Sequence, residues 1–276
     1  MRLLDRPGGF LEGNIEALHA GLERVLHAEN SAARRGLLQP LDARVKVAGL
    51  LSLILVTATG KRLGTIAALF ALAVVLALLS RISFRVLATR VWTGTLVFTG
   101  AIALPALFLT PGTALYRVPG LQWTLTSQGL TTAGYLLLRV ATSATLALLL
   151  VFTTPWAHVL KALRVFRVPV VFVVILGMAA RYILLLLETA LEMFESRQSR
   201  TVGALDRAAR RRMAVASAGV LLNRSLQLSG DVYLAMQARA FRGEVCLLDD
   251  FAMKRLDWLA LAGFAGCAAA AAWAGR

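Results

Sequence analysis

The sequence predicts an all-α integral membrane protein in which a helical membrane bundle carries a cytoplasmic helical module. Of the 276 residues, 58% are hydrophobic and the mean hydropathy is +0.70, whereas a soluble domain is about 45–50% apolar. Several apolar runs approach the ~20 residues that a spanning helix needs. The 30 Lys and Arg residues against 15 Asp and Glu give a net charge of +15. That excess is typical of cytoplasmic loops beside anionic lipid headgroups.

Residues 1–40 form a predicted cytoplasmic N-terminal extension with one amphipathic helix over residues 10–28. The apolar stripe of this helix consists of Leu11, Ile15, Leu18, Leu22, Val25 and Leu26. Its other faces carry mainly glutamate, which favours packing on its own protein over lying on a membrane surface, where a basic face is needed. The extension has no apolar signal-peptide core, so we expect no cleaved signal.

Residues 41–152 form a predicted membrane domain of four spans. These are the apolar runs 45–59, 63–79, 91–109 and 129–152. The first two are short and are joined by Gly60-Lys61-Arg62, which predicts a thin helical hairpin. Segment 110–128, with two prolines, two interfacial aromatics and one charge, predicts an exterior loop. Arg139 lies within the fourth run, and we expect it to be satisfied inside the helix bundle.

Residues 153–250 form a predicted cytoplasmic module of one short and two long helices. The short helix opens at Thr153-Thr154-Pro155, with a threonine as N-cap and the proline as the first helical residue. The long helices cover residues 169–200 and 206–242, or roughly 48 Å and 56 Å at ~1.5 Å per residue. Gly203 and Gly243 follow them, as glycine often follows a helix C-terminus.

Segment 168–187 is apolar enough to be taken for another span. If the N-terminus is inside, four spans return the chain to the cytoplasm near Thr153. A fifth span here would place residues 188–255, with their eleven Lys and Arg residues, outside the cell. Because positive charge favours the inside, we predict a cytoplasmic helix buried against other protein. The last domain, residues 251–276, then supplies the fifth span at 258–274.

Several short motifs carry a family resemblance. Each long helix ends in a small-Arg-small triplet, Ser199-Arg200-Thr201 and Ala238-Arg239-Ala240. The short helix opens with Thr-Thr-Pro-Trp-Ala-His-Val-Leu-Lys-Ala-Leu, and residues 41–46 read Leu-Asp-Ala-Arg-Val-Lys. In this order and spacing, over roughly residues 30–275, they resemble the T component of energy-coupling-factor (ECF) transporters. With the long N-terminal extension, the sequence is most similar to the cobalt-type member, CbiQ.

The resemblance implies a non-catalytic coupling subunit of an ATP-driven importer in the bacterial inner membrane. It implies two ABC-type ATPase subunits, a substrate-binding membrane subunit and a small accessory membrane subunit as partners. Cobalt is the implied substrate; nickel and vitamin-type T components are the alternatives. The implied ATPase-coupling residues are Ser199, Arg200, Thr201, Ala238, Arg239 and Ala240. We expect no cofactor and no metal site in this chain, because the partner ATPases would bind ATP.

The short helix and the apolar helix after it have apolar surface that no spanning role explains. We therefore expect them to form a platform for the substrate-binding subunit. The platform residues that we predict are Pro155, Trp156, Leu160, Leu163, Pro169 and Leu184. A related stripe on the second long helix, Leu222, Leu226, Tyr233 and Met236, also predicts packing on a partner.

Other functions are less well supported by the residues. The chain has no phosphate-binding G-x-x-x-x-G-K-[ST] loop, and its three histidines and two cysteines show no metal-ligand spacing. A membrane-embedded lipid-modifying enzyme could use the basic run 207–212 to hold phosphate, but a nucleophile or acid pair is missing. A self-contained permease would need polar residues along its spans. A single arginine in the last turn of a helix needs no functional explanation, because the helix dipole stabilises it by ~0.3–1 kcal/mol. The presence of two, Arg200 and Arg239, at the ends of adjacent long helices favours a functional interpretation.

Overall fold

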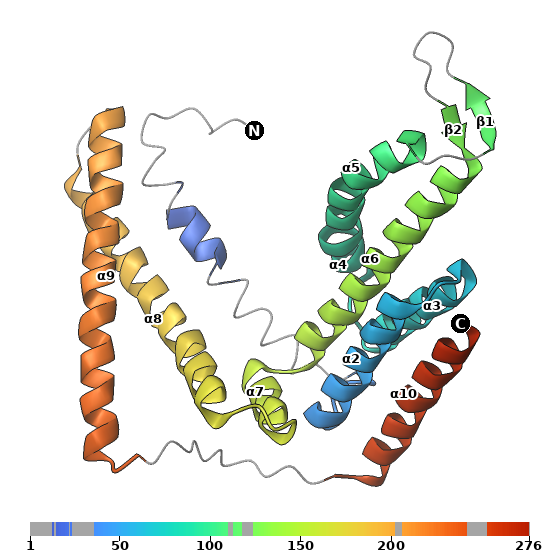
Figure 1. Ribbon diagram of the computed structural model, residues 1–276. Helices are drawn as coiled ribbons and strands as arrows, with labels where there is room; N and C mark the ends of the chain where they lie inside the picture. The colour runs from blue at the N-terminus through green and yellow to red at the C-terminus, as the bar shows by residue number, and fades with distance from the viewer. Residues whose placement is uncertain are drawn as a thin grey trace. The chain divides into compact units, whose positions relative to one another are not determined.

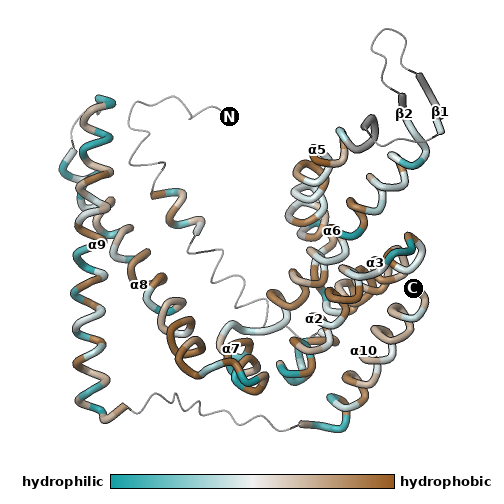
Figure 2. Tube along the Cα trace, in the orientation of Figure 1, coloured by the Kyte–Doolittle hydropathy of each residue, from teal (hydrophilic) through white to brown (hydrophobic). Residues whose placement is uncertain are grey.

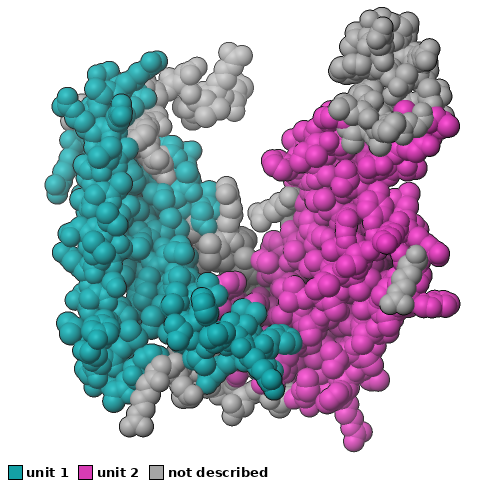
Figure 3. Space-filling model, viewed as in Figure 1, with its two compact units in different colours: residues 1–28, 163–248 teal, residues 29–162, 249–276 magenta. Residues whose placement is uncertain are grey.

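The computed structural model describes residues 13, 15–21, 23, 36–109, 113–117, 124–201, 206–241 and 253–275. Helices dominate it (Figure 1), and the predicted class of an all-α membrane protein is confirmed. One short hairpin lies in the predicted exterior loop, where β1 (Ala114–Arg117) pairs antiparallel with β2 (Thr124–Thr126). The chain divides into two compact units, residues 1–28 with 163–248, and residues 29–162 with 249–276 (Figure 3).

The second of these units, which we call the bundle, contains most of the helices in the first two thirds of the chain and the C-terminal helix. In chain order they are α2 (Ala43–Thr59), α3 (Leu63–Leu79), α4 (Phe84–Val86), the π-helix η1 (Leu87–Trp92), α5 (Thr93–Leu109), α6 (Ser127–Thr153) and α10 (Arg255–Ala274). Helix α2 lies between α6 and α10 and contacts both. Its buried side chains Leu50 and Leu53 share one core with Leu146 and Leu149 of α6.

A glycine allows α2 and α10 to approach each other closely. A Cβ atom at Gly49 would lie 2.5 Å from the ring of Phe264, which is well inside a van der Waals contact. Phe264 therefore packs directly over the α2 backbone and completes the core from the α10 side. A larger residue at position 49 would have to displace this ring.

Local signals start and stop the helices of the bundle. Asp42 caps α2, because its carboxylate accepts a hydrogen bond from the Arg44 amide at 2.8 Å. Thr126 caps α6 in the same way, accepting from the Gly129 amide at 3.2 Å. Helix α3 ends in a Schellman motif with Arg81 in the left-handed region (φ 55°), a position that usually takes glycine.

Arg139 lies on α6 and has an aromatic partner one helical turn away. Its guanidinium carbon stacks over the Tyr135 ring at 5.7 Å from the ring centre, and the Tyr135 hydroxyl donates to the Gly60 carbonyl. A cation over an aromatic face is stabilised by the ring quadrupole, more strongly away from water. This geometry agrees with an arginine that is satisfied within the bundle.

Four described helical stretches are long and apolar enough to cross a membrane: Leu87–Pro105, Ser127–Thr153, Val170–Arg200 and Arg255–Ala274. Leu63–Leu79 is apolar but shorter. By length and composition alone, Val170–Arg200 therefore qualifies as a span. Its cytoplasmic placement rests on the charge argument and remains a prediction.

Cysteine labelling tests this topology. The test uses a variant that lacks the two native cysteines and carries Leu205→Cys. Position 205 lies between the two long helices and outside the described residues. We expect an impermeant reagent to label it only after the membrane is opened, because an external position would place a strongly basic segment outside the cell. Labelling from the external side of intact cells would overturn the five-span topology, and a cysteine at Thr113, in the predicted exterior loop, is the positive control.

Candidate functional site

The candidate site is built on three consecutive helices, α7 (Trp156–Val165), α8 (Val170–Arg200) and α9 (Arg207–Ala238). The predicted start of α7 is displaced by one residue. Pro155 is the capping residue rather than the first helical residue, because its carbonyl accepts the first helical bond, from the Val159 amide at 3.2 Å. Thr153 is the last residue of α6, and Thr154 is extended (φ −135°, ψ 118°), as steric clash with a following proline requires.

The predicted platform residues on α7 do not all face outward. Leu160 is only 6% exposed, so it packs within this chain and leaves no surface for a partner. Its neighbour Val159 packs with Ala162 against Ala43 and Val47 of α2. By contrast, the Trp156 side chain is 45% exposed. The start of α7 is therefore attached to the bundle by one face and offers the other face to solvent or to a partner.

The N-terminal half of α8 exposes several large apolar side chains, among them Val171, Phe172 and Ile175. In Figure 2 the most hydrophobic colour of α8 is concentrated in its first turns, and hydrophilic residues become more frequent toward its C-terminal end. Among the predicted platform residues, Pro169 is exposed and Leu163 and Leu184 are half-buried. Beside Leu184, the side chain of Ile183 is 63% exposed. Exposed large apolar groups along one helix are typical of a surface that another protein or the membrane covers.

The first triplet lies at the end of α8, as predicted. Arg200 is the last helical residue and is exposed. The Thr201 hydroxyl donates to the Arg197 carbonyl at 2.7 Å, and the Ser199 hydroxyl donates to the Glu195 carbonyl at 3.1 Å. The Thr201 hydroxyl therefore satisfies a carbonyl of the last turn, where intrahelical partners run out, whereas the Ser199 hydroxyl adds a bond to a carbonyl further inside the helix. Thr201 itself is the cap and adopts an extended conformation (φ −98°, ψ 116°).

The second triplet ends α9 through a different geometry. Ala238 is the last helical residue, Arg239 is the cap, and Ala240 adopts the left-handed conformation with φ 50°. The Phe241 amide donates to the Met236 carbonyl, and the Ala240 amide donates to the Gln237 carbonyl, both at 3.0 Å. These two bonds define a Schellman motif. The helix thus ends four residues before the predicted boundary at 242, because a left-handed residue stops it ahead of Gly243.

Ala240→Gly should stabilise the end of α9 by about 1 kcal/mol, because an L-residue in the left-handed conformation carries roughly that strain and glycine does not. Amide exchange in the last turn of α9 measures the change, and we expect slower exchange. The matched control is Ala235→Gly, inside the helix, which should destabilise the helix end by about 1 kcal/mol. Faster exchange in Ala240→Gly would show that the left-handed conformation is not the stable one.

The two triplets lie at opposite ends of the α8–α9 pair. Helices α8 and α9 run in opposite directions (Figure 1). The Nη1 atom of Arg197 on α8 donates to the Met213 carbonyl of α9 at 3.4 Å. Arg200 therefore lies beside the first turns of α9, whereas Arg239 lies at its far end. With 32 residues, α9 separates the two ends by about 48 Å at 1.5 Å per residue.

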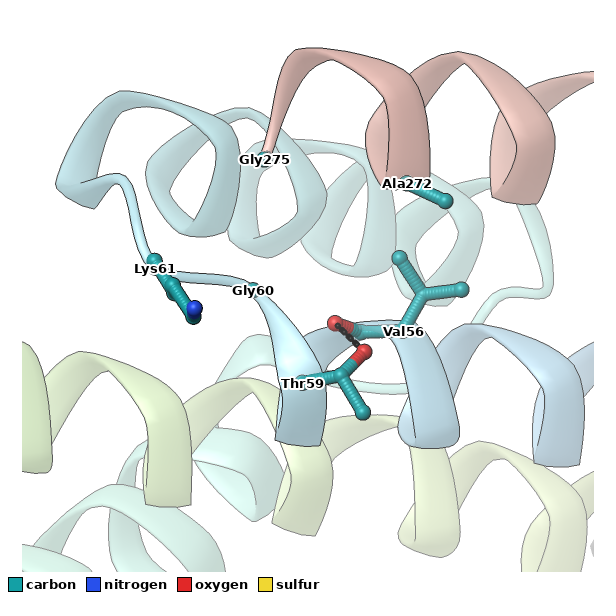
Figure 4. A pocket seen from close by; sticks show the side chains of 6 residues that line it. All are labelled: Val56, Thr59, Gly60, Lys61, Ala272 and Gly275. Atoms are coloured by element: carbon teal, nitrogen blue, oxygen red, sulfur yellow. Dashed lines mark hydrogen bonds between the residues drawn. The ribbon is translucent and has the colours of Figure 1, made fainter.

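A pocket in the bundle lies apart from these residues. It has a volume of about 360 Å³ and is lined by Val56, Thr59, Gly60, Lys61, Ala272 and Gly275 (Figure 4). Its walls are mainly backbone and small side chains at the C-terminal ends of α2 and α10. None of the predicted site residues lines it. Among the described residues, no group of three or more His, Cys, Asp or Glu side chains could hold a metal ion.

Comparison with known proteins gives the same family as the sequence motifs. The family described as cobalt transport protein, CbiQ, matches residues 35–246. A protein of Methanocaldococcus jannaschii that is described as uncharacterized is 34% identical over 241 residues, which is 86% of this chain and 82% of that protein. The family match includes both triplets, the short helix and the start of α2.

Proposed function

This chain belongs to the cobalt transport protein family, a family of membrane transport components, and on that premise we propose that it is the coupling (T) subunit of an ECF-type importer. In this proposal the chain passes ATP-driven movement from two ABC-type ATPase subunits to a substrate-binding membrane subunit. The family description makes cobalt the proposed substrate, with nickel and vitamins as the alternatives. The proposed location is the cytoplasmic (inner) membrane.

The observation that carries this proposal is the pair of exposed arginines at the two ends of α8 and α9. A guanidinium at a helix C-terminus, between small residues, can enter a pocket and pair with a carboxylate through two parallel hydrogen bonds. Arg200 and Arg239 lie about one length of α9 apart, at ~1.5 Å for each of its residues. That separation suits two separate subunits, each holding one helix end. The helix dipole alone would explain one such arginine but not the paired arrangement.

Rigid helices are required to transmit a movement over this distance. Sharp helix kinks arise almost always at proline, at Gly/Ser pairs or at π-bulges. The sequence has no proline after Pro169. Helix α8 is one uninterrupted α-helix, and α9 also continues without a break, through its Ser229-Gly230 pair. A displacement of either arginine would therefore tilt its whole helix. The substrate-binding subunit would experience this tilt through the exposed apolar half of α8.

The remaining parts of the proposal concern what this chain does not do itself. The ATPase subunits bind ATP, and this chain acts without a cofactor and without catalysis. The substrate-binding subunit, with a small accessory membrane subunit, captures the ion. The Arg-Ala-Ala-Arg-Arg-Arg run at the start of α9 then serves as a solvated cytoplasmic surface near anionic headgroups.

Copurification and uptake test the proposal together. A tagged chain, expressed in its native host, should bring down two ATPase chains and a substrate-binding subunit, and the purified complex, reconstituted in vesicles, should support ATP-dependent cobalt uptake. Uptake of nickel and of vitamins, measured in the same vesicles and compared with uptake of cobalt, identifies the substrate. A chain that purifies alone and modifies lipids by itself would contradict the coupling role and favour the enzyme alternative.

A further inference from the structure

A buried lysine near the start of α2 has no role in the function proposed above. Lys46 is one turn into the helix and only 2% exposed, although lysine is almost never fully buried unless it is paired. Its Nζ donates to the Thr153 carbonyl at 2.9 Å and to the Gln39 carbonyl at 3.4 Å. Thr153 is the last residue of α6, so the ammonium group lies at the C-terminal end of that helix.

Two carboxylates complete the surroundings of this lysine. Asp257, in the first turn of α10 and also 2% exposed, accepts from the Asp42 amide and from the Lys254 amide, each at 2.8 Å. Asp42 in turn caps α2. The charges of Asp42 and Asp257 both act on the Lys46 ammonium group. We name Asp42, Lys46, Thr153 and Asp257 the anchor cluster.

The signs of these charges match the three helix ends that meet at the anchor cluster. A helix C-terminus carries partial negative charge and an N-terminus partial positive charge. The positive Lys46 lies at the C-terminus of α6, and the negative Asp42 and Asp257 lie at the N-termini of α2 and α10. An apolar side chain in place of Lys46 could fill the space, but it would leave the Thr153 carbonyl without its buried donor.

The three helix ends are also the places where the chain leaves and re-enters the bundle. Helix α6 ends at Thr153 and α10 begins at Arg255, so α7, α8 and α9 all lie on the segment between them. The start of α7 packs on Ala43 and Val47, which belong to the same turn of α2 as Lys46. Both attachment points of this segment therefore depend on the first turn of α2.

We propose that the anchor cluster is the joint through which load passes between α7–α9 and the membrane bundle, with Lys46 as its positioning residue. This inference rests on the proposed function, because it needs α8 and α9 to be moved by partners. If only one end of the segment between α6 and α10 were fixed, a tilt of α8 would rotate the free end and would not move the bundle. Because both ends are held on one buried turn of α2, the tilt moves α2, α6 and α10 together.

Amide exchange on the full-length chain in lipid nanodiscs tests the joint without any partner. In Lys46→Met we expect about tenfold faster exchange in the last turn of α6 and the first turn of α10, because a lost hydrogen bond to a charged group opens them locally. The C-terminal half of α2 should keep its wild-type exchange. Lys61→Met, the same substitution at the exposed far end of α2, is the matched control. Unchanged exchange at both ends in Lys46→Met would overturn the proposal.

Coupling in the assembled complex provides the second measurement. The Lys46→Met complex should keep its ATPases and hydrolyse ATP, but transport per ATP hydrolysed should fall about tenfold, in line with the local opening above. Asp42→Asn, which keeps the helix cap and removes a charge, should give a smaller fall, and it serves if Lys46→Met does not fold. If both variants transport as much per ATP hydrolysed as the wild type, the anchor cluster is not the joint. Absence of ATPases from the wild-type complex would instead overturn the proposed function, while the exchange result still decides the joint.

Discussion

Changing Arg200 and Arg239 together to alanine should remove both ATPase subunits from the complex while the chain still inserts in the membrane. Each arginine is exposed at a helix end and has no role in the packing of its own unit, so the loss should fall on the interface alone. Removing one partner of a buried hydrogen-bonded charge pair typically costs about 2–5 kcal/mol. Each single alanine variant should therefore lower uptake strongly, and the double variant should leave no ATPase after affinity purification.

Two further variants separate this contact from general electrostatics. Lysine at position 200 or 239 should restore uptake only in part, because an ammonium group cannot pair with a carboxylate through two parallel hydrogen bonds. Arg212→Ala, on the exposed basic run near the start of α9, removes the same charge from a residue outside the two triplets and should have little effect. If Arg212→Ala prevented assembly while Arg200→Ala and Arg239→Ala left uptake normal, the ATPase contact would lie on the basic run and not at the triplets.

Leu184→Glu should detach or uncouple the substrate-binding subunit while the ATPases stay bound. Leu184 lies on the apolar half of α8, and a carboxylate there would be buried against a partner without a counter-charge. The cost of burying an unpaired charge is several kcal/mol, which is enough to break a membrane-subunit contact. Copurification of each partner with the variant, together with uptake, measures the effect. A complex that assembles and transports normally would show that the platform lies elsewhere.

The half-buried position of Leu184 calls for a second variant, because Leu184→Glu could weaken its own chain. Ile183 is more exposed, so Ile183→Glu introduces the charge with little effect on the isolated chain. If this region of α8 is the platform, Ile183→Glu should detach the same subunit. Gln227→Glu adds the same charge at an exposed polar position of α9 and should leave both partners bound.

Most of the helical segments, and the positions of the two triplets along them, could be predicted from the sequence alone. The apolar run 63–79 has the same bounds as α3, and the prediction for the first long helix differs from α8 by one residue. These features depend on neighbours within about one helical turn, such as a capping carboxylate or a proline that limits the residue before it. The same local information placed Arg200 in the last turn of α8, and Arg239 at the end of α9.

Which helix ends meet and which apolar residues are covered could not be predicted without the folded structure. Lys46 looked like part of a short motif, and its role depends on Thr153, 107 residues away, and on an Asp42–Asp257 contact across 215 residues. Leu160 belonged to the predicted apolar face of α7, but the folded chain buries it to 6% exposure. The physical reason is common to both: the contacts of Lys46 and the burial of Leu160 depend on packing between segments distant in sequence, whereas helix formation depends mainly on nearby residues. The end of α9 at Ala238 is a local feature, but its Schellman motif has Ala240 in the position that glycine usually takes, so it could be recognised only from the backbone.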